Sequence, residues 1–157
     1  AVTYTIATGT DLANTLAIIR PIAPPTGADR VNSLVKLADE VYSTVNTKTE
    51  SAAFQLAVWA ITYGAYENGR YVINTTNSGF RVDSGTANSA YGVMANNWLA
   101  DLDTAAYTGN YQLTYLNDGT ANYTQDMVVF TNVPEPAVLG FLAIGLLALG
   151  FLRRQRV

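Results

Sequence analysis

The stretch NTKTESAAFQLAVWAITYGAY, residues 46–66, decides how this chain folds. Small and apolar residues recur along it three and four positions apart, which is the spacing of one helix face. These residues are Ala53, Leu56, Ala57, Ala60 and Ile61. Phe54, Val58 and Trp59 make much of the remaining surface apolar as well. Because a surface helix keeps a polar side for water, the pattern predicts a central helix that is buried on several sides.

The ends of this helix and its two neighbours can be placed from capping residues and spacing. Thr49 or Ser51 can cap its start, and Gly64 weakens its far end. A second helix is expected at residues 31–45 and a third at residues 87–103. A proline-rich loop precedes the second helix and ends in its expected cap, Asp29. The third helix is expected to turn six residues toward the core, namely Tyr91, Met94, Ala95, Trp98, Leu99 and Leu102.

Short strands complete the body of the chain. Apolar alternation predicts strands at residues 1–9, 71–75 and 79–84, and two more at 110–118 and 121–133 flank the turn dipeptide Asp118–Gly119. The sequence therefore predicts an α+β fold over residues 1–132: a small domain of about three helices with short antiparallel strands and a C-terminal hairpin. A single C-terminal transmembrane helix is expected to follow within residues 133–157.

The composition excludes several classes of function. Charged residues make up only 13% of the chain and the net charge is −3, so we expect no nucleic-acid partner. Cysteine and histidine are absent, which removes disulfides, thiol nucleophiles, Cys/His zinc sites and the common histidine general base. A paired-carboxylate hydrolase is conceivable from Asp39, Glu40, Glu50 and Glu67, but no spacing favours one. We expect no cofactor, no metal and no enzymatic activity.

Residues 133–157 differ in character from the rest. Ala137 to Leu152 is an unbroken run of apolar residues and glycine, which as a helix spans roughly 24 Å. Leu139, Phe141, Leu146 and Leu149 are expected to anchor the run in membrane lipid, and the basic stop Arg153, Arg154 and Arg156 follows at once. Positive charge favours the cytoplasmic side, which places the C-terminus inside and the body outside. An interfacial or core helix is the alternative.

The tail also resembles a known pattern. VPEP at residues 133–136, the apolar run, and RRQR at 153–156 together resemble the PEP-CTERM sorting signal of Gram-negative bacteria, whose motif corresponds here to Pro134, Glu135 and Pro136. The resemblance implies export through the bacterial inner membrane, recognition by an exosortase, and a place at the cell surface or in the extracellular matrix. A chance match beside an ordinary anchor is the alternative. The chain begins at Ala1 without an initiator Met, so we expect a removed signal peptide or an incomplete sequence.

A second, shorter resemblance lies inside the predicted central helix. Gln55, Ala57 and Trp59 form a Q-x-A-x-W stretch similar to that of bacterial thioester domains, in which the glutamine is joined to a cysteine. Without cysteine no such bond can form, so Gln55 is expected to be a buried or half-buried amide that bonds to neighbouring backbone.

Taken together, these features predict a non-enzymatic exported protein that is tethered to the membrane and binds protein or polysaccharide partners at the surface or in the matrix. Ten tyrosines could serve such binding, although strands favour tyrosine in any case. The alternative function is an accessory single-span subunit of a respiratory or photosynthetic membrane complex, with a periplasmic domain.

Overall fold

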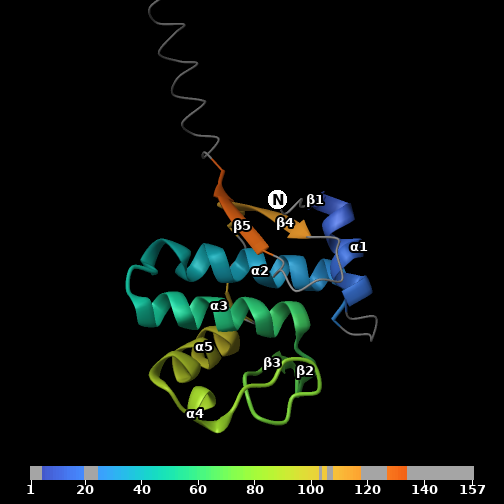
Figure 1. Ribbon diagram of the computed structural model, residues 1–157. Coiled ribbons are helices and arrows are strands. Elements are labelled where there is room, and N and C mark those ends of the chain that lie inside the picture. Colours follow the sequence, from blue (N-terminus) through green and yellow to red (C-terminus); the bar gives the residue numbers. More distant parts are fainter. Residues whose placement is uncertain (1–4, 20–24, 103, 106–107, 118–126, 134–157) are drawn as a thin grey trace, which may run out of the picture.

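The computed structural model describes residues 5–19, 25–102, 104–105, 108–117 and 127–133 (Figure 1). In chain order the elements are β1 (Thr5–Ala7), α1 (Gly9–Ile19), α2 (Gly27–Val41), the 3-10 turn η1 (Tyr42–Thr44), α3 (Lys48–Tyr63), β2 (Tyr66–Glu67), β3 (Arg70–Tyr71), α4 (Ser84–Ala87), α5 (Ala90–Asp101), β4 (Tyr111–Asn117) and β5 (Met127–Asn132). The α+β class is confirmed, with α1 and α4 added to the three helices that the sequence predicts.

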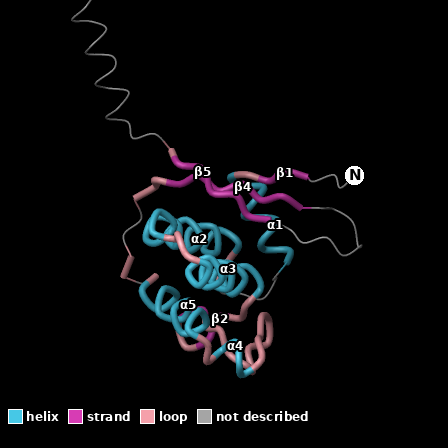
Figure 2. The backbone as a smooth tube through the Cα atoms, turned by 60° about the vertical axis from the view of Figure 1, so that its left-hand side comes forward, coloured by secondary structure: helices cyan, strands magenta, loops and turns pink. Residues whose placement is uncertain are grey.

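The elements are stacked on one another. An antiparallel sheet with strand order β1-β4-β5 covers one side of α2, and α3 and α5 lie successively farther from it (Figure 2). α1 packs beside α2, while α4 and the β2–β3 hairpin lie at the end of the molecule away from the sheet (Figure 1). The chain leaves the described part at Val133, directly after the edge strand β5.

The prediction of a central, many-sided helix is confirmed by α3. Ala53, Ala57, Ala60 and Ile61 have no solvent exposure, and Phe54 and Val58 on an adjoining face are also buried. The prediction for the third helix holds as well, since α5 and the residue after it place Ala95, Leu99 and Leu102 in the core, with Tyr91, Met94 and Trp98 packed against it. These contacts attach α5 to the central helix α3, on the side away from the sheet.

The predicted helix caps are wrong by a few residues. Thr47, not Thr49 or Ser51, caps α3, and Thr26, not Asp29, caps α2. In both cases the acidic residue three positions on completes a capping box: the Thr47 N–H donates to the Glu50 carboxylate at 2.8 Å, and the Glu50 N–H donates to the Thr47 hydroxyl at 3.2 Å. Two backbone donors are satisfied by such a reciprocal pair, whereas a single cap satisfies one.

A buried arginine joins α2 to the end of α3. Arg30 is only 2% exposed, and its guanidinium donates to the carbonyl oxygens of Ile61, Thr62 and Gly64. It also lies over the ring of Tyr71, 5.6 Å from the ring centroid. The last carbonyls of a helix lack partners within the helix and carry partial negative charge, so the buried cation is compensated there.

Several local predictions for the N-terminal third and for residues 64–83 are wrong. α1 was not anticipated, although Leu12 and Leu16, one helical turn apart, are both buried. The strands expected at 71–75 and 79–84 do not form; instead β2 and β3 make a hairpin around Asn68 and Gly69, which have φ angles of 52° and 83°. Positive φ at both central residues is the type I′ turn that Asn-Gly favours.

Asparagine side chains take the place of strand pairing in this segment. Asn77 is buried; its amide oxygen accepts from the Ala65 N–H and its amide nitrogen donates to the Ala65 carbonyl, both at 2.9 Å. Asn96 of α5 bonds in the same two-way manner to the N–H and carbonyl of Ile73, at 2.8 and 2.9 Å. A carboxamide carries one acceptor and two donors, so it can substitute for a neighbouring strand. This is why an irregular segment can run against the core.

The hairpin expected near the C-terminus is confirmed as β4 and β5, which pair antiparallel from Tyr111↔Asn132 to Leu116↔Met127. The expected turn at Asp118–Gly119 lies outside the described residues. Among the helices that the structure describes, none is long and apolar enough to cross a membrane. The predicted span and its flanking motif, residues 134–157, also lie outside the described part.

Candidate functional site

A groove of about 560 Å³ lies between α3 and the edge strand β5. Its walls come from both elements, with one residue from η1, and every lining residue is uncharged. The lining residues are Tyr42, Ser51, Phe54, Gln55, Val58, Trp59, Met127, Val128, Val129 and Phe130. A concave, largely apolar surface with a few polar groups is the usual form of a binding site.

Aromatic rings fix the two walls relative to each other. Phe54 of α3 meets Phe130 of β5 edge-on at 5.4 Å between centroids, and Tyr42 lies 5.2 Å from Phe54 and 5.5 Å from Phe130. Tyr111 at the start of β4 meets Tyr42 edge-on at 5.4 Å. Such pairs stabilise beyond their burial by about 0.5–1.5 kcal/mol each. The groove is therefore preformed, because its base is part of the packed interior.

The Q-x-A-x-W stretch contributes two residues to the groove and one to the core. Gln55 and Trp59 are one turn apart on the groove side of α3, and Ala57 is fully buried on the other side. The expectation that Gln55 is buried is wrong: its side chain is exposed. The reason is helical geometry, since position 55 lies about 200° around the helix from the buried Ala53.

The opposite wall is β5, which lies at the edge of the described sheet. With the order β1-β4-β5, β5 has a neighbour on one side only within the described residues. Met127 and Val129 are 43% and 41% exposed, and the strand MVVFTN contains neither charge nor proline. Natural proteins usually protect an exposed edge with charges, prolines or bulges. β5 has none of these.

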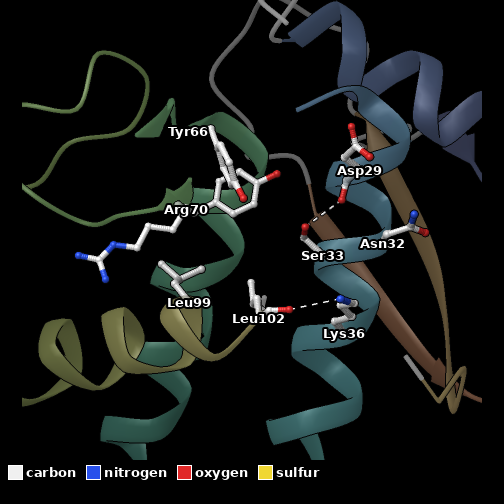
Figure 3. A pocket seen from close by; sticks show the side chains of 9 residues that line it. Asp29, Asn32, Ser33, Lys36, Tyr66, Arg70, Leu99 and Leu102 are labelled. Atoms are coloured by element: carbon white, nitrogen blue, oxygen red, sulfur yellow. Dashed lines mark hydrogen bonds between the residues drawn. The ribbon is translucent and has the colours of Figure 1, made fainter. Parts of the chain in front are cut away.

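A second, smaller pocket of about 240 Å³ lies between α2, the end of α5 and the β2–β3 hairpin (Figure 3). Two of its polar groups are already engaged: the Ser33 hydroxyl donates to the Asp29 carbonyl at 2.8 Å, and the Lys36 ammonium donates to the Leu102 carbonyl at 3.3 Å. Arg70 points away from the other labelled side chains in Figure 3. Burial raises the pKa of Tyr71, which also lines this pocket, to about 12, so its phenol is neutral at physiological pH. The groups of this pocket do not converge on a ligand.

The four carboxylates considered from the sequence do not form one cluster: Asp39 and Glu40 line a pocket with Asp101, and neither Glu50 nor Glu67 lines that pocket. Asp39 accepts three backbone N–H groups, from Thr108, Gly109 and Asn110, at 2.9–3.0 Å. Glu50 accepts from the Thr47 N–H in the capping box of α3, and Glu67 accepts from the Asn74 amide at 3.3 Å. Partial desolvation of the Glu40 carboxylate, together with the neighbouring Asp101 carboxylate, raises the pKa of Glu40. In the part of the chain that the structure describes, no group of three or more acidic side chains is placed to hold a metal ion.

Comparison with known proteins identifies the tail. Residues 132–156 match the family model described as the PEP-CTERM protein-sorting motif. The chain carries a PEP-CTERM sorting signal. The match confirms the resemblance of the tail, and it includes Pro134, Glu135 and Pro136. The PEP-CTERM signal makes this an exported protein that is anchored through its C-terminal signal, and such signals are recognised by exosortase.

For the rest of the chain, no curated protein and no solved structure matches. The similarity of Gln55, Ala57 and Trp59 to thioester domains therefore stays a prediction. The PEP-CTERM signal begins at Asn132, which is also the last residue of β5. Head and signal are thus directly joined, because the chain passes from the strand that forms one wall of the groove to the signal without a linker.

Proposed function

We propose that this chain is a non-enzymatic surface or extracellular-matrix protein, whose head binds a protein or polysaccharide partner in the α3–β5 groove while the tail tethers it to the bacterial inner membrane. The observation that carries the proposal is the direct continuity between the groove wall β5 and the sorting signal at residues 132–156. A head joined so closely to its tether acts at the envelope surface, where exported partners are.

The tail supports an anchor with the head outside the cytoplasm. Ala137 to Leu152 would lie in lipid, and the arginines at 153, 154 and 156 would remain on the cytoplasmic side. The ~24 Å span is shorter than the ~30 Å hydrocarbon core, but arginine side chains can reach out to the interface. The head is therefore periplasmic until exosortase acts at Pro134–Pro136, and surface- or matrix-located afterwards.

The groove supports binding and not catalysis. Its polar side-chain groups are the Gln55 amide, the Ser51 and Tyr42 hydroxyls and the Trp59 indole N–H. They can hydrogen-bond a ligand but do not serve as general bases at neutral pH without an activating partner. The sequence contains no histidine or cysteine to supply one. An uncharged aromatic groove is typical of recognition of neutral protein or sugar surfaces.

The test follows the fate of the tail. The full chain is expressed in a Gram-negative host with and without its exosortase, and the membrane, surface and medium fractions are examined by intact mass. We expect removal of the tail near Pro134–Pro136 only when exosortase is present, and loss of this step in Glu135→Ala. Glu40→Ala, which changes an exposed glutamate of the head, serves as the matched control. An intact tail in a stoichiometric complex with other membrane subunits, unaffected by Glu135→Ala, would refute the proposal and favour an accessory subunit.

A further inference from the structure

The partner of the groove can be specified further, on the basis of the proposed function. We propose that it enters as an extended, uncharged polypeptide segment that pairs with the free edge of β5 and places alternate side chains against α3. A groove between a strand edge and a helix is suited to this mode of recognition, because main-chain bonds to the strand give affinity and pockets for alternate side chains give specificity.

The first argument is the state of the β5 edge. β5 pairs with β4 in unbroken register over six residue pairs, from Met127↔Leu116 to Asn132↔Tyr111, so the strand is regular along its length. In an antiparallel strand alternate residues direct their N–H and C=O groups away from the paired neighbour. Four consecutive residues of this edge strand, Met127 to Phe130, line the groove. In the proposed complex the outward groups of these residues pair with the incoming segment.

The second argument is the wall opposite this edge. Phe54 and Val58 form an apolar base, and Gln55 offers an amide that can both donate and accept. Trp59 is held in place because its ring packs 5.8 Å from that of Phe80. Phe54 and Val58 belong to the hydrophobic core, so this wall is held in place by the packed interior and a strand could be received without rearrangement of the fold.

The third argument is charge. All ten lining residues are neutral, so a charged side chain that entered the groove would lose water and gain no partner. The matching segment is therefore uncharged, with apolar or hydroxyl side chains at the inward positions. At about 3.3 Å per residue, the six residues of β5 offer roughly 20 Å, enough for a segment of about six residues.

The aromatic rings favour a peptide over a sugar. A sugar needs a flat ring face open to solvent, but Tyr42, Phe54 and Phe130 pack against one another at interplanar angles of 43–71°. Phe54 is buried and each of the three rings is engaged by the other two, whereas the outer edge of β5 has no paired strand among the described residues. Binding of a neutral polysaccharide is accordingly the competing outcome of the test.

The experiment uses the full chain in detergent and measures fluorescence anisotropy. The probes are a panel of labelled, end-capped heptapeptides with threonine at alternate positions and alanine, valine, isoleucine or phenylalanine between them. Matched probes carry N-methyl groups at every second residue, in either register, which removes the outward N–H donors. A labelled neutral glucan oligosaccharide is the third probe. We expect at least one peptide to bind, and methylation in one register to weaken its binding at least tenfold.

Variants on the two walls locate the site. Val129→Lys on β5 and Gln55→Lys on α3 change exposed side chains, and each should weaken peptide binding at least tenfold. Ile6→Lys is the matched control, since Ile6 is a 67% exposed apolar residue on β1 at the opposite edge of the same sheet. It should leave binding within twofold. Circular dichroism of each variant checks that the fold is intact.

Three results would overturn the inference. The first is equal binding of methylated and unmethylated peptides, or no binding by any peptide of the panel. The second is binding of the glucan alone, lost in Gln55→Lys, which would leave the proposed tethered binding protein intact but change its partner. The third is a dimer of the chain that Val129→Lys dissociates, which would assign the edge to a second copy. Failure of the proposed function itself would appear separately, in the fractionation and mass experiment.

Discussion

Replacement of Arg30 by methionine tests whether the buried cation holds α2 to the end of α3. The guanidinium donates to the carbonyls of Ile61, Thr62 and Gly64 and lies over the ring of Tyr71. Hydrogen bonds with a charged donor contribute about 1.5–3 kcal/mol each, and a desolvated cation–π contact about 2 kcal/mol. Against this stands the cost of burying the charge, several kcal/mol, which methionine does not incur. The net expectation is a loss of about 3 kcal/mol in the free energy of unfolding.

The measurement is urea unfolding of the full chain in detergent, followed by tryptophan fluorescence, with the slope of the transition checked for constancy. Arg30→Lys is the informative companion variant, because an ammonium keeps the charge but cannot spread donors over three carbonyls. We expect it to be destabilised as well, by less than the methionine variant. If Arg30→Met lowers the free energy of unfolding by less than about 1 kcal/mol, the desolvation of the buried charge offsets the energy of its contacts, and the reasoning is wrong.

Three further predictions concern other parts of the chain. Burial raises the pKa of Tyr71 from 10.0 to about 12 in the folded state. Between these pH values the unfolded chain binds fewer protons than the folded chain, so the free energy of unfolding falls as pH rises, by about 3 kcal/mol in all. Tyr71→Phe should remove this part of the alkaline loss when urea unfolding is measured at several pH values. Asp39→Asn weakens the acceptor for the N–H groups of Thr108, Gly109 and Asn110 and should lower the free energy of unfolding in urea by about 2 kcal/mol. The control Asp101→Asn changes an exposed carboxylate and should lower it by less than half as much. Equal losses would contradict this role for Asp39. Leu146→Arg in the middle of the expected span should make the free energy of membrane insertion less favourable by about 2.5–3.5 kcal/mol and move the protein out of the membrane fraction. The control Gln155→Arg should leave it there. Undiminished membrane attachment of Leu146→Arg would argue against the anchor.

The sequence was most informative where periodicity and burial agree. Ala53, Ala57 and Ile61 recur on one side of α3, and the same spacing places Ala95 and Leu99 on α5, so both helices and their packing could be predicted. The β4–β5 hairpin could also be predicted, because alternation on both strands flanks a turn dipeptide. The sorting signal was recognisable for a different reason, as three parts in a fixed order.

The sequence was least informative where side chains replace regular backbone pairing. Residues 71–84 contain enough β-branched and aromatic residues to suggest strands, but Asn77 and Asn96 occupy the hydrogen bonds that strands would use. No periodicity records such a bond. The Asn68–Gly69 turn, by contrast, was a readable signal for a hairpin, and Leu12 and Leu16 were a readable signal for α1.

The groove could be predicted only in part. Gln55 and Trp59 were singled out together with Ala57, and their spacing of four is enough to place these two on one helix face. That this face looks toward β5 depends on the order of the strands, which a single sequence does not specify. The unprotected edge follows from the same order, since MVVFTN would be an ordinary inner strand if another strand lay beside it.

The position of β5 has a mechanical consequence. The strand ends where the sorting signal begins, so tension on the tail is applied at the end of β5, and its component along the strand axis loads the strand in shear. Hydrogen bonds between antiparallel strands lie perpendicular to that axis, so the six residue pairs with β4 resist in shear together and do not open one after another. With a partner strand added at the other edge, force between the envelope and the partner would travel through β5 itself and bypass the helices. The head could then carry a pull for longer than the stability of its small core alone would permit.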